Sequence, residues 1–206
     1  TLFGLLYLDN TIFTPNCISA IIAHKKESLG YIWEIIRLAH ATMFAPLKPK
    51  LIDDSKTTLS FGNNSKIMVS LGVQATALHN LHVSEYAYCD PLSIEMTIAA
   101  AGPNANITYE TTANGMNHAR DVWREGKSLL KLFHPWFIDP AYTVKANNVV
   151  LSDEEKTFSE RAKRDYNVII TGGQVAFRRQ KHNELKFLAK QEFAESAEEC
   201  FLSSGF

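Results

Sequence analysis

The chain of 206 residues has the composition of a folded globular protein and almost no net charge. Apolar residues make up 46% and charged residues 21%, which excludes an intrinsically disordered protein. The 21 Lys and Arg residues are balanced by 22 Asp and Glu residues, for a formal charge of −1, so a strongly basic nucleic-acid coat is excluded as well. Three widely spaced cysteines without a CxxC pair argue against a disulfide framework or a zinc knuckle.

The first residues are apolar, but residues 2–8 are too few to cross a bilayer and no basic stretch precedes them. Neither a membrane span nor a signal peptide is therefore expected. We interpret residues 2–10 as the rear of a buried helix and expect the start of the chain to be truncated.

Predicted strands and helices then alternate as far as residue 138. Residues 18–24 have the β-branched, apolar character of a strand buried on both faces, and apolar residues recur at helical spacing from Leu29 to Met43. Alternating residues on either side of Gly62-Asn63-Asn64-Ser65 predict a hairpin. Further strands are predicted at residues 78–84, 107–111 and 129–134, and helices at 92–101 and 117–127. This alternation predicts an α/β domain with a mostly parallel sheet over residues 1–138.

Residues 139–206 contain several helix-start signals and few strand signals, and they predict a small helical subdomain. Ser152 and Glu155, Thr171 and Gln174, and Ser196 and Glu199 each fit a capping box, in which both side chains satisfy free N–H groups at a helix start. The region is locally basic, and a solvated helix face is favoured over a DNA or subunit contact. These basic residues are Arg161, Lys163, Arg164, Arg178, Arg179 and Lys181.

An acidic residue follows the predicted strand at residues 78–84. The run LHNLHVS ends at Ser84 and Glu85 comes next, which places a carboxylate at the carboxyl edge of the sheet, where ligands bind in open α/β folds. In a phosphate-cleaving site such a carboxylate can orient and polarise a water molecule. A charge at the start of the next helix explains the same residue without any chemistry.

A polar segment, TTANG, follows the next predicted strand. Thr111, Thr112 and Asn114 could sense a phosphate or the attacking water, and Gly115 would permit a sharp turn. A plain strand-to-helix turn explains the same residues, since Asn-Gly is common in turns.

HVSEYAY (82–88) is followed by TTANG (111–115) and FHPWF (133–137). In this order the segments resemble the ATPase domain of tailed-phage large terminases, the motors that package viral DNA. TGGQVAFRR (171–179) is similar to a family segment with Thr, Gln, an aromatic residue and two arginines, and FLAKQEF (187–193) with EECFLSSGF (198–206) to its closing segment. The resemblance covers nearly the whole chain.

The resemblance implies a P-loop NTPase fold of the ASCE type, with a mostly parallel sheet flanked by helices and a helical lid or linker at 139–206. Glu85 matches the family's catalytic carboxylate and Ser84 its magnesium-side neighbour, which is usually Asp. Thr111, Thr112 and Asn114 match the motif that couples hydrolysis to movement. A nuclease domain would follow Phe206, so nuclease activity is not expected from this segment.

The resemblance also implies an enzyme that uses ATP and Mg²⁺ to move double-stranded DNA into a procapsid. Its partners would be the DNA, the portal protein, the small terminase subunit and further copies of itself in a pentameric ring. We expect it in the host cytoplasm, transiently on the procapsid, and not in a membrane.

Two departures from the family pattern leave other functions open. The sequence contains no GxxxxGK[ST] loop, which with its central strand should precede Thr1. Gln74 stands where many relatives have an Arg that reaches the neighbouring subunit's site, and Gln supplies no positive charge. The missing loop, Gln74 and Ser84 suit a non-catalytic assembly module. A helicase-like P-loop ATPase is the other alternative, although helicases usually carry Ser-Ala-Thr in place of TTANG.

Overall fold

The computed structural model describes residues 2–72 and 77–201. The chain divides into two compact units, Thr1–Thr111 and Thr112–Phe206. The sequence pattern predicts the boundary between the two domains later, after residue 138. No helix among the described residues is long and apolar enough to cross a membrane.

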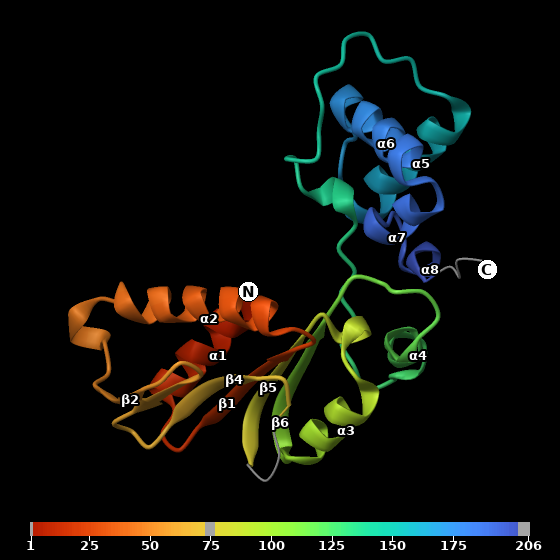
Figure 1. Ribbon diagram of the computed structural model, residues 1–206. Helices are drawn as coiled ribbons and strands as arrows, with labels where there is room; N and C mark the ends of the chain where they lie inside the picture. Colours follow the sequence, from red (N-terminus) through yellow and green to blue (C-terminus); the bar gives the residue numbers. More distant parts are fainter. Residues whose placement is uncertain (1, 73–76, 202–206) are drawn as a thin grey trace. The chain divides into compact units, whose positions relative to one another are not determined.

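The first unit is a six-stranded sheet with helices on both faces (Figure 1). Its strands lie in the order β2-β3-β4-β1-β5-β6, and β1, β4, β5 and β6 are mutually parallel. The elements are α1 (Leu2–Phe13), β1 (Ile18–Ala23), α2 (Lys26–Ala41), β2 (Leu51–Asp54), β3 (Thr58–Phe61), β4 (Lys66–Ser70), β5 (Leu78–Ser84), α3 (Pro91–Ala99) and β6 (Ala101–Glu110). The predicted α/β class with a mostly parallel sheet is therefore confirmed.

The hairpin predicted around Gly62-Asn63-Asn64-Ser65 joins β3 to β4. The two strands pair antiparallel with Ser60 opposite Lys66, and Asn64 takes the positive φ of 65° that this tight connection requires. β2 was not predicted; it pairs antiparallel with β3 at the edge of the sheet.

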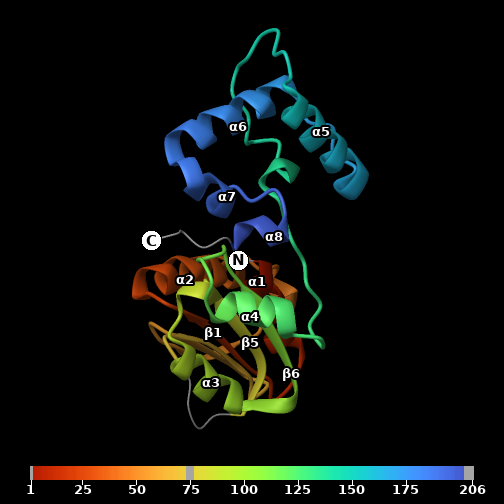
Figure 2. The same ribbon diagram turned by 90° about the vertical axis from the view of Figure 1, so that its right-hand side faces the viewer.

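Helices α1 and α2 cover one face of the sheet and α3 lies on the other (Figures 1 and 2). Under α1 and α2, apolar residues of both helices and of β1, β3 and β4 form one buried cluster, which includes Trp33, Ile36 and the fully buried Ile21. The apolar stripe read from Leu29 to Met43 is thus the buried face of α2, with Trp33 in the core as its helical spacing indicates.

Helix α1 runs antiparallel to the parallel strands. Near its start, the Phe3 ring lies 5.7 Å from that of His82, close to the carboxyl end of β5. Near its end, Thr11 Oγ1 and Ser19 Oγ at the start of β1 are 2.6 Å apart. The N-terminal end of α1 therefore lies at the edge of the sheet where the parallel strands end.

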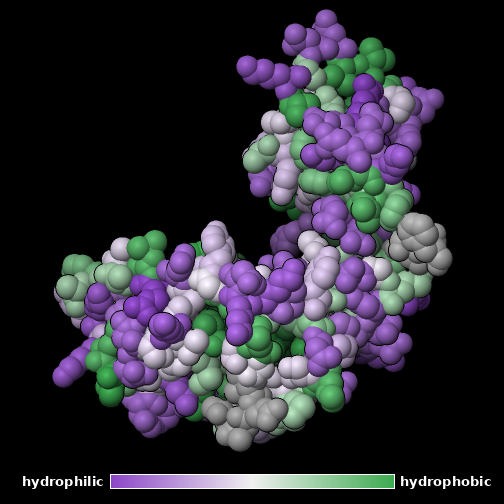
Figure 3. Space-filling view, viewed as in Figure 1, coloured by the Kyte–Doolittle hydropathy of each residue, from purple (hydrophilic) through white to green (hydrophobic). Residues whose placement is uncertain are grey.

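The second unit is helical and has an aromatic core. Trp136, Phe137, Phe158 and Ala162 are buried together, and Phe177 and Phe193 pack against them. The visible face over α5 and α6 is mostly hydrophilic (Figure 3). The helices are α4 (His118–Glu125), α5 (Asp153–Tyr166), α6 (Gly172–Leu185), α7 (Ala189–Glu192) and α8 (Ala197–Cys200).

Side-chain caps begin α5, α6 and α8 at the three predicted positions. Ser152 with Glu155, and Thr171 with Gln174, form complete capping boxes. At α8 the Ser196 side chain accepts from the Glu199 N–H group.

The strand predicted at residues 129–134 is wrong. The segment is irregular, with Leu130 and Leu132 exposed by 87% and 60%. A strand forms only where a neighbouring strand accepts its backbone hydrogen bonds, and a short apolar alternation does not supply that partner.

Candidate functional site

The carboxyl ends of the parallel strands border a cavity of about 440 Å³ in the first unit. Helix α2 forms one wall, and the residues at the ends of β5 and β6 form the other. Its lining is Glu27, Ser28, Tyr31, Ile32, Ser84, Glu85 and Glu110. Two predicted site residues, Ser84 and Glu85, therefore share one cavity at the edge where open α/β sheets bind ligands.

Glu85 has a left-handed backbone conformation directly after β5, with φ 56° and ψ 46°. Such a conformation costs a non-glycine residue on the order of 1 kcal/mol or more and is concentrated at functional sites. The turn is fixed behind it, because the Glu85 carbonyl accepts a hydrogen bond from the Tyr88 N–H group at 2.9 Å. The side chain is half-buried and lines the cavity.

Ser84 is the last residue of β5 and is 7% exposed. It pairs across the sheet with Ala23 of β1 and with Glu110 of β6. A hydroxyl, rather than the carboxylate usual in the resembled family, thus stands at the centre of this edge.

Glu110 is a site residue that the sequence pattern did not single out. It is the last residue of β6 and the register partner of Ser84. Its Oε2 lies 3.2 Å from Nε2 of the completely buried His82, and this neighbour lowers the pKa of Glu110 while burial opposes the shift. The only available sequence signal was its place just before TTANG, because the pairing of β5 with β6 is not local in sequence.

Thr111 connects the two strand ends. Its Oγ1 accepts a hydrogen bond from the Ala87 N–H group at 3.0 Å, two residues beyond Glu85. The rings of Tyr86 and Tyr109 lie beside this contact, 4.7 Å apart, and burial is the main cause that raises the pKa of Tyr86 to about 12. The turn that carries Glu85 is therefore anchored to β6.

The rest of TTANG belongs to the second unit. Thr112 and Asn114 are exposed, Gly115 has a positive φ of 61°, and the Asn117 side chain caps the start of α4. The turn that was predicted from Asn-Gly is present. Gln74 lies outside the described residues.

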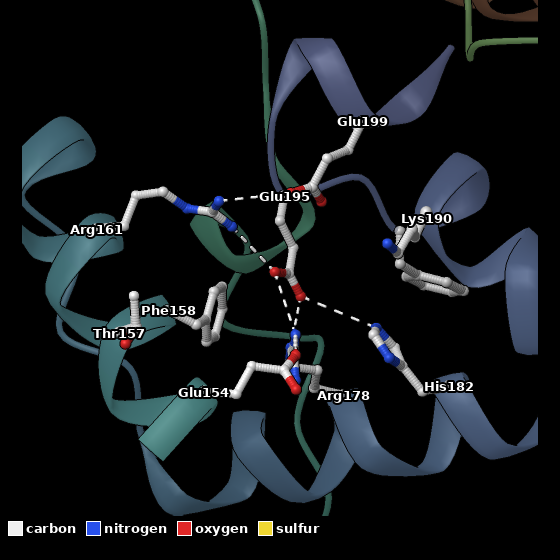
Figure 4. Close-up of a pocket in the computed structure, with 10 residues that line it drawn as sticks. Glu154, Thr157, Phe158, Arg161, Arg178, His182, Lys190, Glu195 and Glu199 are labelled. Carbon is white, nitrogen blue, oxygen red and sulfur yellow. Dashed lines mark hydrogen bonds and ion pairs between the residues drawn. The ribbon is translucent and has the colours of Figure 1, made fainter. Parts of the chain in front are cut away.

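A second cavity, of about 320 Å³, lies within the helical unit and is lined by charged side chains (Figure 4). Glu195 is its centre: Arg178 Nε contacts Glu195 Oε1 at 2.5 Å, and Arg161 contacts Oε2 at 3.1 Å. Glu195 and Arg178 are 7% and 10% exposed, so this part of the basic region is an internal ion-pair network. The prediction of a solvated basic face is wrong for Arg178.

No group of three or more His, Cys, Asp or Glu residues in the described part of the chain is arranged to hold a metal ion. Ser84, Glu85 and Glu110 nevertheless offer oxygen atoms, the donors that Mg²⁺ prefers, and Mg²⁺ commonly uses one or two carboxylates together with substrate phosphates. The strand ends therefore present the oxygen atoms of one hydroxyl and two carboxylates to the cavity.

No protein-family model matches the chain, and no curated protein matches it.

Proposed function

We propose that this chain is the ATP-hydrolysing part of a viral large terminase, which drives double-stranded DNA into a procapsid. The observation that carries the proposal is the strained Glu85, which follows a central parallel strand and lines the cavity at the carboxyl edge. The order of HVSEYAY, TTANG, FHPWF and the two later segments favours DNA packaging over other ATP-driven functions.

Within this proposal, Glu85 orients and polarises the water molecule that attacks the terminal phosphate of ATP. Thr111, bonded to the turn that carries Glu85, would transmit a change at that turn to the TTANG segment. Bound with the nucleotide, Mg²⁺ would neutralise negative charge that develops on the phosphate oxygens. Ser84 and the neighbouring carboxylates would face that cation.

The described residues fit part of a nucleotide site. Helix N-termini attract phosphate through free N–H groups and the helix dipole, and α1 begins at the same edge as Ser84. The sequence has no GxxxxGK[ST] segment, so residues 1–206 do not supply the loop that wraps the phosphates in P-loop folds. β6 is the last strand of the sheet, and a further strand paired with it would carry such a loop to this edge.

Glu85→Gln in the full-length protein tests the proposal. We expect ATP affinity within about threefold of wild type and turnover reduced by a factor of about 1000 or more, because Gln keeps the shape of the side chain but is not a base. ATP binding would be measured by calorimetry and turnover by phosphate release.

Glu34→Gln is the matched control, since Glu34 is an exposed residue of α2 that is not in the cavity lining. It should behave as wild type. Wild-type turnover in Glu85→Gln would remove Glu85 from the chemistry. A wild-type protein that neither binds nor hydrolyses ATP would favour the non-catalytic assembly module instead.

A further inference from the structure

Three leucines follow α4 on a stretch of chain without regular structure. Leu130 and Leu132 are exposed by 87% and 60%, and Lys131 between them is exposed as well. Within the described part of the chain, no backbone hydrogen bond involves residues 130–134. Residues 129–132, which we call the leucine segment, therefore present apolar side chains together with backbone groups that are left to solvent.

The sheet of the first unit has an open edge at β2 (Figure 1). Among the described strands, β2 pairs with β3 alone, so one side of it has no strand partner. Its Ile52 side chain is exposed by 70%, and Asp53 beside it is exposed too. An edge strand with an exposed apolar side chain is a place where another extended segment can add through backbone hydrogen bonds.

The leucine segment and the β2 edge carry opposite charges that have no partner. Asp54 is neutralised by Arg37, whose Nη1 lies 2.6 Å from Asp54 Oδ1. Neither Asp53 nor Lys131 has an ion pair within the described ranges, 2–72 and 77–201.

These charges determine which pair of surfaces fits together. Two β2 edges would bring Asp53 near a second Asp53, and two leucine segments would bring Lys131 near a second Lys131. Like charges that face one another destabilise a strand pair, whereas opposite charges stabilise it. A contact between one leucine segment and one β2 edge is therefore favoured over either symmetric contact.

We propose that the leucine segment of one copy of the chain adds as a strand to the β2 edge of a second copy. Backbone hydrogen bonds to β2 would satisfy the extended segment, its leucines would cover Ile52, and Lys131 would lie beside Asp53. Because the contact joins two different surfaces, each pair of copies keeps one free surface of each kind, and further copies can add head to tail. This contact would form whether or not the chain hydrolyses ATP.

Sedimentation velocity on the full-length protein tests the contact. A strand pair of about six residues is smaller than a standard stable interface, so we expect a Kd of about 10–100 μM. Leu130→Ser, Lys131→Glu and Asp53→Lys should each weaken association about tenfold or more. Their denaturation midpoints should not change, because all three side chains are exposed. Lys145→Glu, which alters another exposed lysine of the same unit, is the matched control and should associate as wild type does.

An equimolar mixture of Lys131→Glu and Asp53→Lys distinguishes a contact between copies from a contact within one chain. In the mixture, the glutamate introduced at position 131 meets the lysine introduced at position 53 of the other variant, and the unchanged surfaces also match. Association should therefore recover to within about threefold of wild type. A wild type that stays monomeric at about 1 mM, wild-type association of Lys131→Glu or Asp53→Lys alone, or no recovery in the mixture would overturn the inference.

Discussion

Glu85 has a backbone conformation that glycine adopts readily and glutamate does not. With φ 56° and ψ 46° it is left-handed; five other non-glycine residues of the described chain have a positive φ, and four of them are asparagines. Two backbone hydrogen bonds within the turn hold it there, from the Tyr88 N–H group to the Glu85 carbonyl and from the Cys89 N–H group to the Tyr86 carbonyl. The Ala87 N–H group also donates to Thr111 Oγ1. Packing around the turn thus maintains a strained residue at the point where the proposed chemistry occurs.

Replacement of Glu85 by Gly should relieve this strain. We expect Glu85→Gly to raise the free energy of unfolding by about 1 kcal/mol while it abolishes ATP turnover. Urea denaturation of the full-length protein measures the first effect and phosphate release the second. Asn148→Gly is a control, because Asn148 also has a positive φ and asparagine tolerates it, so a gain of only a few tenths of a kcal/mol is expected. A loss of stability in Glu85→Gly would mean that side-chain contacts, rather than turn packing, determine this conformation.

Local sequence patterns predicted only part of the candidate site. An apolar run that ends in an acidic residue revealed both β5 and the place of Glu85. Glu110 was not predicted as part of the cavity lining, because it lies beside Ser84 only through the pairing of β6 with β5, which local sequence does not reveal. The positive φ of Glu85 was also hidden, since nothing in its side chain favours that conformation.

At the scale of elements, strands were predicted correctly where the neighbouring strand that pairs with them could be predicted too. Residues 78–84 form β5, and the hairpin pairs as expected. The error at residues 129–134 and the missed β2 have one cause, which is that pairing depends on neighbours distant in sequence. Helix starts were predicted more reliably, because a capping box is complete within four residues.

The start of α5 combines a cap with an ion pair, and the two can be separated. Glu155 Oε2 accepts from the Ser152 N–H group at 2.8 Å, and Arg179 contacts both oxygens of the same carboxylate at 2.7 Å. The Arg179 guanidinium is the main cause that lowers the pKa of Glu155 to about 2. Because the folded pKa lies below its usual value, the stabilisation is complete above about pH 5 and is lost as the pH falls towards 2.

Glu155→Gln should keep the cap and lose the charge. We expect its free energy of unfolding at pH 7 to be about 2 kcal/mol lower than that of wild type. This difference should shrink as the pH falls from 5 to 2. Urea denaturation at a series of pH values would show this. Glu160→Gln, at an exposed position of the same helix, should show neither effect. A difference that stays constant down to pH 2 would assign the loss to packing.

At the scale of the whole molecule, residues 1–206 contain no phosphate-binding loop of the GxxxxGK[ST] kind for the proposed nucleotide site. The strand ends supply carboxylates, but most nucleotide affinity in P-loop folds comes from backbone N–H groups and a Lys around the phosphates. We therefore expect residues 1–206 alone to bind ATP at least about 100-fold more weakly than the full-length protein. Calorimetry on both would decide it, and equal affinities would show that the site is elsewhere.

DNA packaging by the full-length protein tests the central claim most directly. Procapsids, portal, double-stranded DNA and ATP would be combined with wild-type protein or with Glu85→Gln, and the DNA protected from nuclease would be measured together with phosphate release. We predict ATP-dependent packaging by the wild type, and none by Glu85→Gln although that variant still binds ATP and DNA. Packaging by Glu85→Gln at the wild-type rate, or ATP hydrolysis by the wild type with no DNA moved, would contradict the claim.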